Sequence, residues 1–133
     1  MNKKQRSLLV EWSSQHLSCA VCFWPESDHR RRMEVHHLVG GVNRSKCHDP
    51  RCYLSLCERC HGVYHSGKIY ALTPDLNMGI LLTAKRESDP ENYDPEWLAA
   101  VKNKKHLGWE PEPIPQFFLD ERERNLTWSS RSP

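Results

Sequence analysis

The stretch LCERCHGVYHSG, residues 56–67, decides the fold because it crowds four metal ligands into the space of one short helix. Cys57 and Cys60 have the spacing C-x-x-C, His61 follows directly, and His65 comes one helical turn later. From the first cysteine onward the pattern predicts a helix that ends at the closing glycine. Residues four apart share one face of a helix, so the two histidines can bind a single ion.

A second C-x-x-C pair, Cys19 and Cys22, lies upstream in the segment CAVC. Two such pairs present four thiolates, which is the ligand set of tetrahedral structural zinc. The six cysteines of the chain therefore indicate metal binding before disulfides, as in compartments where thiols stay reduced. Residues 23–56 separate the pairs, which is longer than a compact zinc ribbon needs, and this insert contains EVHHL at 34–38.

A site with His61 and His65 needs a third ligand, and His36 or His37 can supply it. The segment MEVHHLVGG predicts a short strand and a turn, and adjacent strand residues point to opposite faces. One histidine of the pair can therefore bind metal while the other is left for a different task. Three neutral imidazoles leave coordination positions open, and a free histidine beside an open metal suits phosphodiester hydrolysis.

An alternative for these histidines is a second structural zinc site that uses a further cysteine, Cys47 or Cys52. The segment VNRSKCHDPRC, which holds both, is polar and rich in turn residues, and it predicts a loop. If the segment is only a loop, Cys47 and Cys52 are ordinary loop residues. A disulfide between them is a further alternative.

Together, EVHHL and LSLCERCHGVYH resemble the HNH endonucleases, in the branch whose ββα-metal motif is stapled by a four-cysteine zinc and which is common in phages and prophages. The resemblance covers about residues 19–67. It implies an α+β fold in which two antiparallel strands and a helix grip a divalent ion, with flanking helices at both ends. It implies that His37 is the general base. It further implies that the catalytic ion is bound by His36, His61 and His65, and the structural zinc by Cys19, Cys22, Cys57 and Cys60.

The activity implied by the resemblance is one-metal hydrolysis of DNA phosphodiester bonds, which leaves 5′-phosphate and 3′-hydroxyl ends. The catalytic ion would be Mg²⁺, Mn²⁺, Ni²⁺ or Zn²⁺, because imidazole ligands favour the later transition metals while cellular supply favours magnesium. His37 must be neutral to act, and a free histidine titrates near about 6.5, so we expect activity to rise from mildly acid to mildly alkaline pH. The sequence leaves open the cleavage site, nicking against double-strand cleavage, and monomer against homodimer.

One position departs from the family pattern. Where the family usually has an asparagine that braces the loop of the general base, this chain has Cys52, five residues before Cys57. Cysteine is a weak hydrogen-bonding group, and Asn43 at the other end of the loop is an alternative brace. The departure favours a second function, a zinc-stabilised DNA-binding module with weak or no catalysis. A third alternative is a structural adaptor that holds two zinc ions.

The composition constrains the surroundings of this core. The chain has 133 residues with 38% hydrophobic residues, and such a modest core is one that structural metals help to stabilise. No apolar run of about 18 residues predicts a membrane span, and MNKKQRSLLVEW lacks the apolar region of a signal peptide. We therefore expect a cytoplasmic protein of a bacterium or a phage-infected cell, whose partner is double-stranded DNA and whose neighbours include other phage DNA-processing proteins.

Outside the core, the sequence predicts helical support. Thr73 and Asp94, each followed by proline, are predicted helix caps, and QFFLDERERN predicts a last short helix. In that helix Arg122 and Arg124 alternate with acids, which is typical of an ordinary charged surface. The predicted division is 1–18 for an N-terminal helical segment, 19–68 for the nuclease core, 69–126 for a C-terminal helical extension and 127–133 for a frayed tail.

Cations that can contact DNA phosphates flank the predicted strand and helix. The formal net charge of +2 neither requires nor excludes a nucleic-acid partner. For any single cation, a solvated surface charge is an equal alternative. The candidates are Arg30, Arg31, Arg32, Arg44, Lys46 and Lys68.

Overall fold

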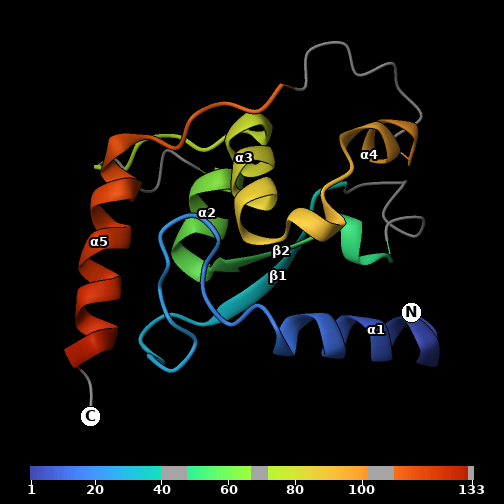
Figure 1. The fold of residues 1–133 in the computed structure, drawn as a ribbon, viewed down its shortest axis with the longest axis horizontal. Helices are drawn as coiled ribbons and strands as arrows, with labels where there is room; N and C mark the ends of the chain where they lie inside the picture. The colour runs from blue at the N-terminus through green and yellow to red at the C-terminus, as the bar shows by residue number, and fades with distance from the viewer. Residues whose placement is uncertain (40–47, 67–71, 102–109, 132–133) are drawn as a thin grey trace.

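The computed structural model describes residues 1–39, 48–66, 72–101 and 110–131 (Figure 1). Helices combine with one two-stranded antiparallel sheet, so the α+β class expected from the sequence is confirmed. The helices are α1 (Lys3–Ser14), α2 (Glu58–Ser66), α3 (Met78–Ser88), α4 (Pro95–Val101) and α5 (Gln116–Arg131), the strands are β1 (Met33–His37) and β2 (Tyr53–Cys57), and two 3-10 turns are η2 (Pro50–Cys52) and η4 (Pro90–Asn92).

The sheet places the two histidines of β1 on different faces. Strand β1 pairs with β2 in the register His36 opposite Leu54 and His37 opposite Tyr53. Side chains alternate along a strand, so His36 shares a face with Leu54 while His37 shares the other face with Tyr53. Strand β2 is buried along its whole length, and it continues into α2 without a connecting loop.

Helix α2 packs against both strands on the face that carries His36. In Figure 1, α2 stands to the left of the two strands, while α1 runs below them. The short strand predicted within MEVHHLVGG is found at Met33–His37, and the helix predicted from Cys57 to about Gly67 is confirmed within a residue or two. Because the chain runs from β1 through β2 into α2, the histidines of α2 lie against β1, although a long segment separates β1 from β2 in the sequence.

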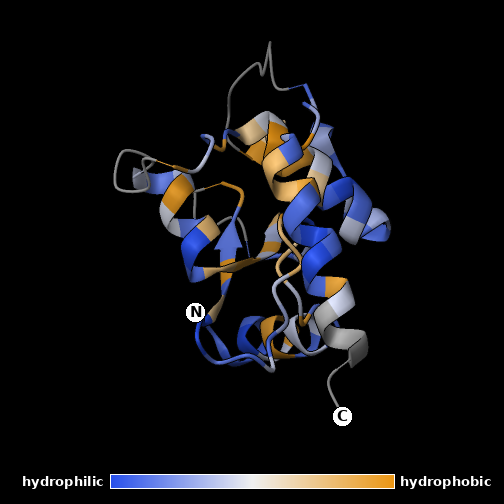
Figure 2. Ribbon diagram, turned by 90° about the vertical axis from the view of Figure 1, so that its left-hand side faces the viewer, coloured by the Kyte–Doolittle hydropathy of each residue, from blue (hydrophilic) through white to orange (hydrophobic). Residues whose placement is uncertain are grey.

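The hydrophobic core joins the segments on either side of this unit. Helix α3 is buried from Gly79 to Lys85 and is largely apolar in Figure 2. Leu98 of α4 and Phe118 of α5 belong to the same cluster of buried side chains as Leu54 and Leu56 of β2. The helical support predicted from the sequence thus packs directly on the strand that carries the second cysteine pair.

A buried ion pair lies at the centre of this packing. Lys85 is fully buried, and its Nζ donates to the carboxylate of Asp89 at 2.6 Å and to the carbonyls of Pro50 and Tyr53 at 2.7 Å. The indole Nε1 of Trp12 donates to the same carboxylate at 2.8 Å. Lys85 of α3 therefore binds the backbone at the start of β2, and Trp12 of α1 binds the carboxylate that pairs with Lys85.

Three predicted helix ends differ in their outcome. Asp94 caps α4 as expected, since its side chain accepts from the amide of Trp97 at 3.0 Å. The cap at Thr73 is wrong, because α3 begins at Met78 and the side chain of Asn77 accepts from Ile80 at 2.9 Å. Helix α5 extends to Arg131, through part of the segment 127–133 for which the sequence predicts a frayed tail. Within the described part of the chain, no helix is long and apolar enough to cross a membrane.

Candidate metal centres

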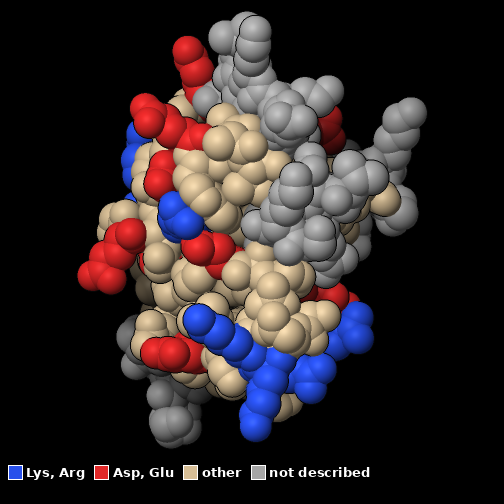
Figure 3. All heavy atoms as spheres, turned by 90° about the vertical axis from the view of Figure 1, so that its right-hand side faces the viewer, with Lys and Arg blue, Asp and Glu red and all other residues tan. Residues whose placement is uncertain are grey.

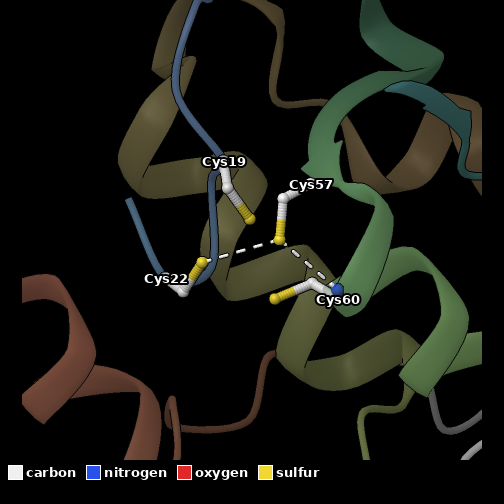
Figure 4. Close-up of side chains that lie close together, drawn as sticks. All are labelled: Cys19, Cys22, Cys57 and Cys60. Atoms are coloured by element: carbon white, nitrogen blue, oxygen red, sulfur yellow. Dashed lines mark hydrogen bonds between the residues drawn. The ribbon is translucent and has the colours of Figure 1, made fainter. Parts of the chain in front are cut away.

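The four cysteines of the two C-x-x-C pairs converge on one point (Figure 4). Cys19 and Cys22 come from the loop after α1, Cys57 ends β2, and Cys60 lies in the first turn of α2. The four side chains are buried as free thiols, and their sulfurs lie within 4.8 Å of one another. The sequence-predicted ligand set is therefore brought together as expected.

This cluster fits a structural zinc ion. Tetrahedral zinc–sulfur bonds of about 2.3 Å place neighbouring sulfurs about 3.8 Å apart. The Sγ atoms of Cys22 and Cys57 lie 3.7 Å apart, and the amide of Cys60 donates to Cys57 Sγ at 3.4 Å. Four buried sulfurs that face one point are the donor set of a single tetrahedral ion, whereas thiols are only weak hydrogen-bonding groups for one another. The geometry is compatible with zinc held by cysteine alone.

Two arginines direct their guanidinium groups at these sulfurs. Arg31 Nη1 lies 3.9 Å from Cys57 Sγ and 4.0 Å from Cys22 Sγ, and Arg59 Nη2 donates to Cys60 Sγ at 3.5 Å. The guanidinium of Arg31 also lies 4.0 Å from the centre of the Trp24 ring, so this tryptophan packs on the arginine. Four thiolates and one zinc ion carry a net charge of −2, and the two guanidinium groups oppose it.

The second cluster consists of His36, His61 and His65. His36 projects from β1 toward α2, and the two histidines of α2 lie one turn apart on the face that packs on the sheet. His36 Nδ1 lies 3.2 Å from His61 Nε2, and His65 Nε2 lies 3.0 Å from the same atom. A shared divalent ion would hold its nitrogen ligands about 3.0 to 3.4 Å apart, so the spacing fits one ion.

Glu34 defines which nitrogen of His61 faces this cluster. Glu34 Oε1 lies 3.1 Å from His61 Nδ1, so that nitrogen carries the proton that the carboxylate accepts. The Nε2 atom of His61 then offers a lone pair to both neighbouring imidazoles at once. One lone pair serves two neighbours poorly, whereas a cation at the centre would be met by all three nitrogens. Sequence reasoning missed Glu34, although its position two residues before His36 places both on one strand face.

The surroundings of His65 favour its neutral imidazole. Burial and the neighbouring His61 lower the pKa of His65 below its ordinary value. The ring of Tyr64 packs edge-on against His36 with centroids 5.0 Å apart. Metal ligation requires unprotonated imidazole, so a lowered pKa keeps His65 available for metal at mildly acid pH.

His37 lies on the opposite face of the strand, as the alternation predicts. Its ring packs edge-on against Tyr53 at 5.3 Å and against His48 at 5.7 Å. The backbone that follows it is held by Cys52, whose carbonyl accepts from Leu38 at 2.8 Å and whose sulfur accepts from Val39 at 3.4 Å. Cys52 is disulfide-bonded, so the interpretation of it as an ordinary loop residue is wrong.

The predicted DNA-contacting cations have different surroundings. Arg30 is mostly exposed and makes a two-pronged pair with Asp28, and Arg32 is also mostly exposed, 3.8 Å from the carboxylate of Glu58. Arg31 is engaged with Trp24 and the cysteines. The remaining candidates lie outside the described residues, as do two other residues of the loop: Arg44, Lys46, Lys68, Asn43 and Cys47.

Comparison with known proteins does not assign this chain. No family model, no curated protein and no solved structure matches it. The resemblance to HNH endonucleases therefore stands on the residues and their geometry alone.

Proposed function

We propose that this protein is a metal-dependent HNH-type endonuclease that hydrolyses phosphodiester bonds in DNA. The observation that carries the proposal is the convergence of three imidazole nitrogens within 4.8 Å, next to a strand residue, His37, that alternation places on the opposite face of β1. The order strand, strand, helix and the adjoining four-cysteine cluster support the same proposal. We further propose that zinc occupies the four-cysteine cluster and stabilises the fold.

The residues divide the chemistry among them. His36, His61 and His65 would hold a divalent ion, and Glu34 would fix the ring of His61 by accepting its Nδ1 proton. A divalent ion at this place supplies Lewis-acid stabilisation of the charge that grows on the phosphate and on the departing 3′-oxygen. His37, neutral, would take the proton of the attacking water, because a histidine near neutrality is an effective general base.

Cys52 can serve the bracing function of the family's asparagine by another route. Its sulfur and its carbonyl accept the two backbone amides that follow His37, those of Val39 and Leu38. An asparagine side chain in this place would act as such a brace through its amide. The backbone after the general base is thus held even though cysteine is a weaker acceptor.

A basic edge offers a surface for the DNA backbone. Lys3, Lys4 and Arg6 are exposed in the first turns of α1, which have no acidic residue. Figure 3 views the end of the molecule at which α1 begins and shows Lys and Arg gathered low on this face. Cations near a helix N-terminus are repelled by the positive end of the helix dipole, so they do not stabilise the helix. Their position therefore favours a role in binding phosphate over a role in stability.

The competing function is a zinc-stabilised DNA-binding module without useful catalysis. The observation that favours it is Cys52 in the place of the family's asparagine. Such a module would keep zinc at the four cysteines and the basic edge for DNA binding, but it would not cleave DNA. Under this alternative the histidine cluster and Glu34 have no catalytic role, and at most they hold a second structural ion.

The deciding experiment is plasmid cleavage after removal of weakly bound metal and addition of Mg²⁺, Mn²⁺, Ni²⁺ or Zn²⁺. The wild-type protein is compared with His37→Ala and with His29→Ala, a matched control at an exposed histidine. We expect nicking or linearisation by the wild type and by His29→Ala, and its loss in His37→Ala with unchanged zinc content. Absence of cleavage with every metal, alongside intact DNA binding, would replace the nuclease proposal by the binding-module function.

A further inference from the structure

Side chains of helix α5 hydrogen-bond to the loop of the first cysteine pair, which lies near the other end of the sequence. Arg122 Nε donates to the carbonyl of Val21 at 2.7 Å, and Arg122 Nη2 donates to that of Ala20 at 3.1 Å. Asn125 Nδ2 donates to the carbonyl of Cys22 at 2.8 Å. Three consecutive carbonyls of the Cys19–Cys22 loop are therefore each bound by a side chain of α5, across a separation of 101 residues for Val21.

The same face of α5 reaches the second cysteine pair through Arg59. Arg59 pairs with the carboxylate of Glu121, and both side chains are largely buried. The Nη2 atom that faces Glu121 also donates to Cys60 Sγ at 3.5 Å. Residues 121, 122 and 125 lie on one helix face, because positions three and four apart are neighbours on a helix.

These contacts exist only while the cysteine loop is closed. The loop turns back on itself so that the amide of Phe23 donates to the carbonyl of Cys19 at 2.9 Å, and Phe23 has a φ of 65°, a backbone conformation that non-glycine residues rarely adopt. Without a cation, several thiolates in one buried space would repel one another. An opened loop would withdraw the carbonyls of Ala20 and Val21 from Arg122, which is only 8% exposed and would keep Glu87 as a hydrogen-bond partner.

We propose that α5 is a clamp on the four-cysteine zinc site. In this arrangement Glu121, Arg122 and Asn125 keep both ligand loops closed, so zinc leaves slowly while α5 is docked, and loss of zinc releases α5. The inference does not depend on the nuclease activity. It depends on zinc at the four cysteines, and a purified chain without tightly bound zinc would overturn it.

The test is the rate at which zinc passes from the full-length protein to the chromogenic chelator 4-(2-pyridylazo)resorcinol. We expect Arg122→Ala and Asn125→Ala each to speed this transfer roughly tenfold, because each removes buried hydrogen bonds to the ligand loop. Arg124→Ala, an exposed arginine on the same helix, is the matched control and should transfer zinc at the wild-type rate. Should Arg122→Ala fail to fold, Asn125→Ala carries the test alone.

A second control separates the clamp from a general loss of stability. Asn77→Ala removes the cap of α3, a helix that contributes none of the four cysteines, and should lower the stability of the fold without speeding zinc transfer. Hydrogen exchange then tests whether loss of zinc releases α5. Amides of α5 should lose protection at the same chelator concentration as those of residues 19–22. Equal transfer rates in all variants, or protection of α5 that outlasts zinc, would overturn the proposal.

Discussion

At the scale of single residues, Glu34 is the side chain whose effect on the histidine cluster can be isolated. Glu34→Gln keeps the size of the side chain but removes the charge that holds the Nδ1 proton of His61. We expect the affinity of the cluster for Ni²⁺ or Zn²⁺ to fall by roughly 10-fold to 100-fold, as for other carboxylates behind metal-binding histidines. Titration calorimetry on protein with filled cysteine sites measures this, and Glu11→Gln, at an exposed position, is the control. An unchanged dissociation constant would contradict the assigned role.

Tyr53 is a second informative residue, because it is fully buried and its hydroxyl has no hydrogen-bond partner among the described residues. Burial raises the pKa of this hydroxyl, which keeps it neutral. Tyr53→Phe removes an unpaired polar group, so we expect the free energy of unfolding to stay unchanged or to rise by up to about 1 kcal/mol. Urea denaturation checks this, with Tyr93→Phe as control. A clear loss of stability would mean that the hydroxyl has a partner.

Asp89 links a single carboxyl group to the pH dependence of folding. Burial alone would raise the pKa of Asp89, but the hydrogen bonds from Lys85 and Trp12 outweigh it, so the pKa is lowered. A carboxyl with a lowered folded-state pKa contributes stability above its unfolded pKa of about 3.9, and this contribution is lost as the pH falls through the folded-state value.

Asp89→Asn should therefore destabilise the protein by about 3 to 5 kcal/mol at neutral pH, because it leaves the ammonium of Lys85 buried without its counter-charge. The difference in unfolding free energy between wild type and variant should narrow below about pH 4. Urea denaturation at several pH values measures it, with Glu91→Gln as an exposed control. A difference that persists unchanged in acid would show that the carboxylate charge is not what stabilises Lys85.

At the scale of elements, Gly79 shows how closely two segments approach. A Cβ atom at this position would lie 2.6 Å from the carbonyl oxygen of Glu110, and it would also meet the side chain of Glu112. Alanine normally stabilises a helix by about 1 kcal/mol relative to glycine. Here we expect Gly79→Ala to destabilise the protein by about 1 to 3 kcal/mol, measured by thermal unfolding. Glu112→Ala should not rescue it, because the backbone contact remains; rescue would show that the side chain alone is the obstacle.

The elements themselves were predictable where local signals were strong. The C-x-x-C pair and the i, i+4 histidines in residues 57–65 predicted the turn from strand to helix, and Asp94 with its proline predicted the start of α4. The start of α3 was missed because Thr73 and Pro74 carry the same cap signal as Asn77, and the choice between them depends on which residues α3 buries. That burial is a tertiary property, which a local cap signal does not contain.

At the scale of the whole molecule, the sequence predicted the members of both clusters but not the contacts that surround them. Arg122 reads as a surface charge among acids, yet it is buried against a loop near the other end of the chain. Lys85, in the last turn of α3, is likewise fully buried. Both depend on pairing over long sequence separations, and no local periodicity encodes such pairing.

The two clusters should respond differently when their ligands are removed. Cys57→Ser removes one of the four buried thiols that we propose as zinc ligands, so we expect loss of zinc and of the cooperative fold. His61→Ala removes a ligand of the partly exposed histidine cluster, so we expect the fold and the first metal to remain while binding of a second divalent ion is lost. Circular dichroism and metal analysis of the purified proteins measure both. Unfolding of His61→Ala would favour the alternative of a second structural zinc.

Helix α2 begins directly where β2 ends, and Cys60 and His61 are neighbours on it. Each residue of a helix turns the following side chains by about 100°. Insertion of a single residue between Cys60 and His61 would therefore swing His61 and His65 away from His36 while the four cysteines stayed in place. Proteins that share an ancestor with this chain should tolerate insertions and deletions in the loops but none between residues 53 and 65. The spacing within this short segment should therefore change more slowly in evolution than the rest of the sequence.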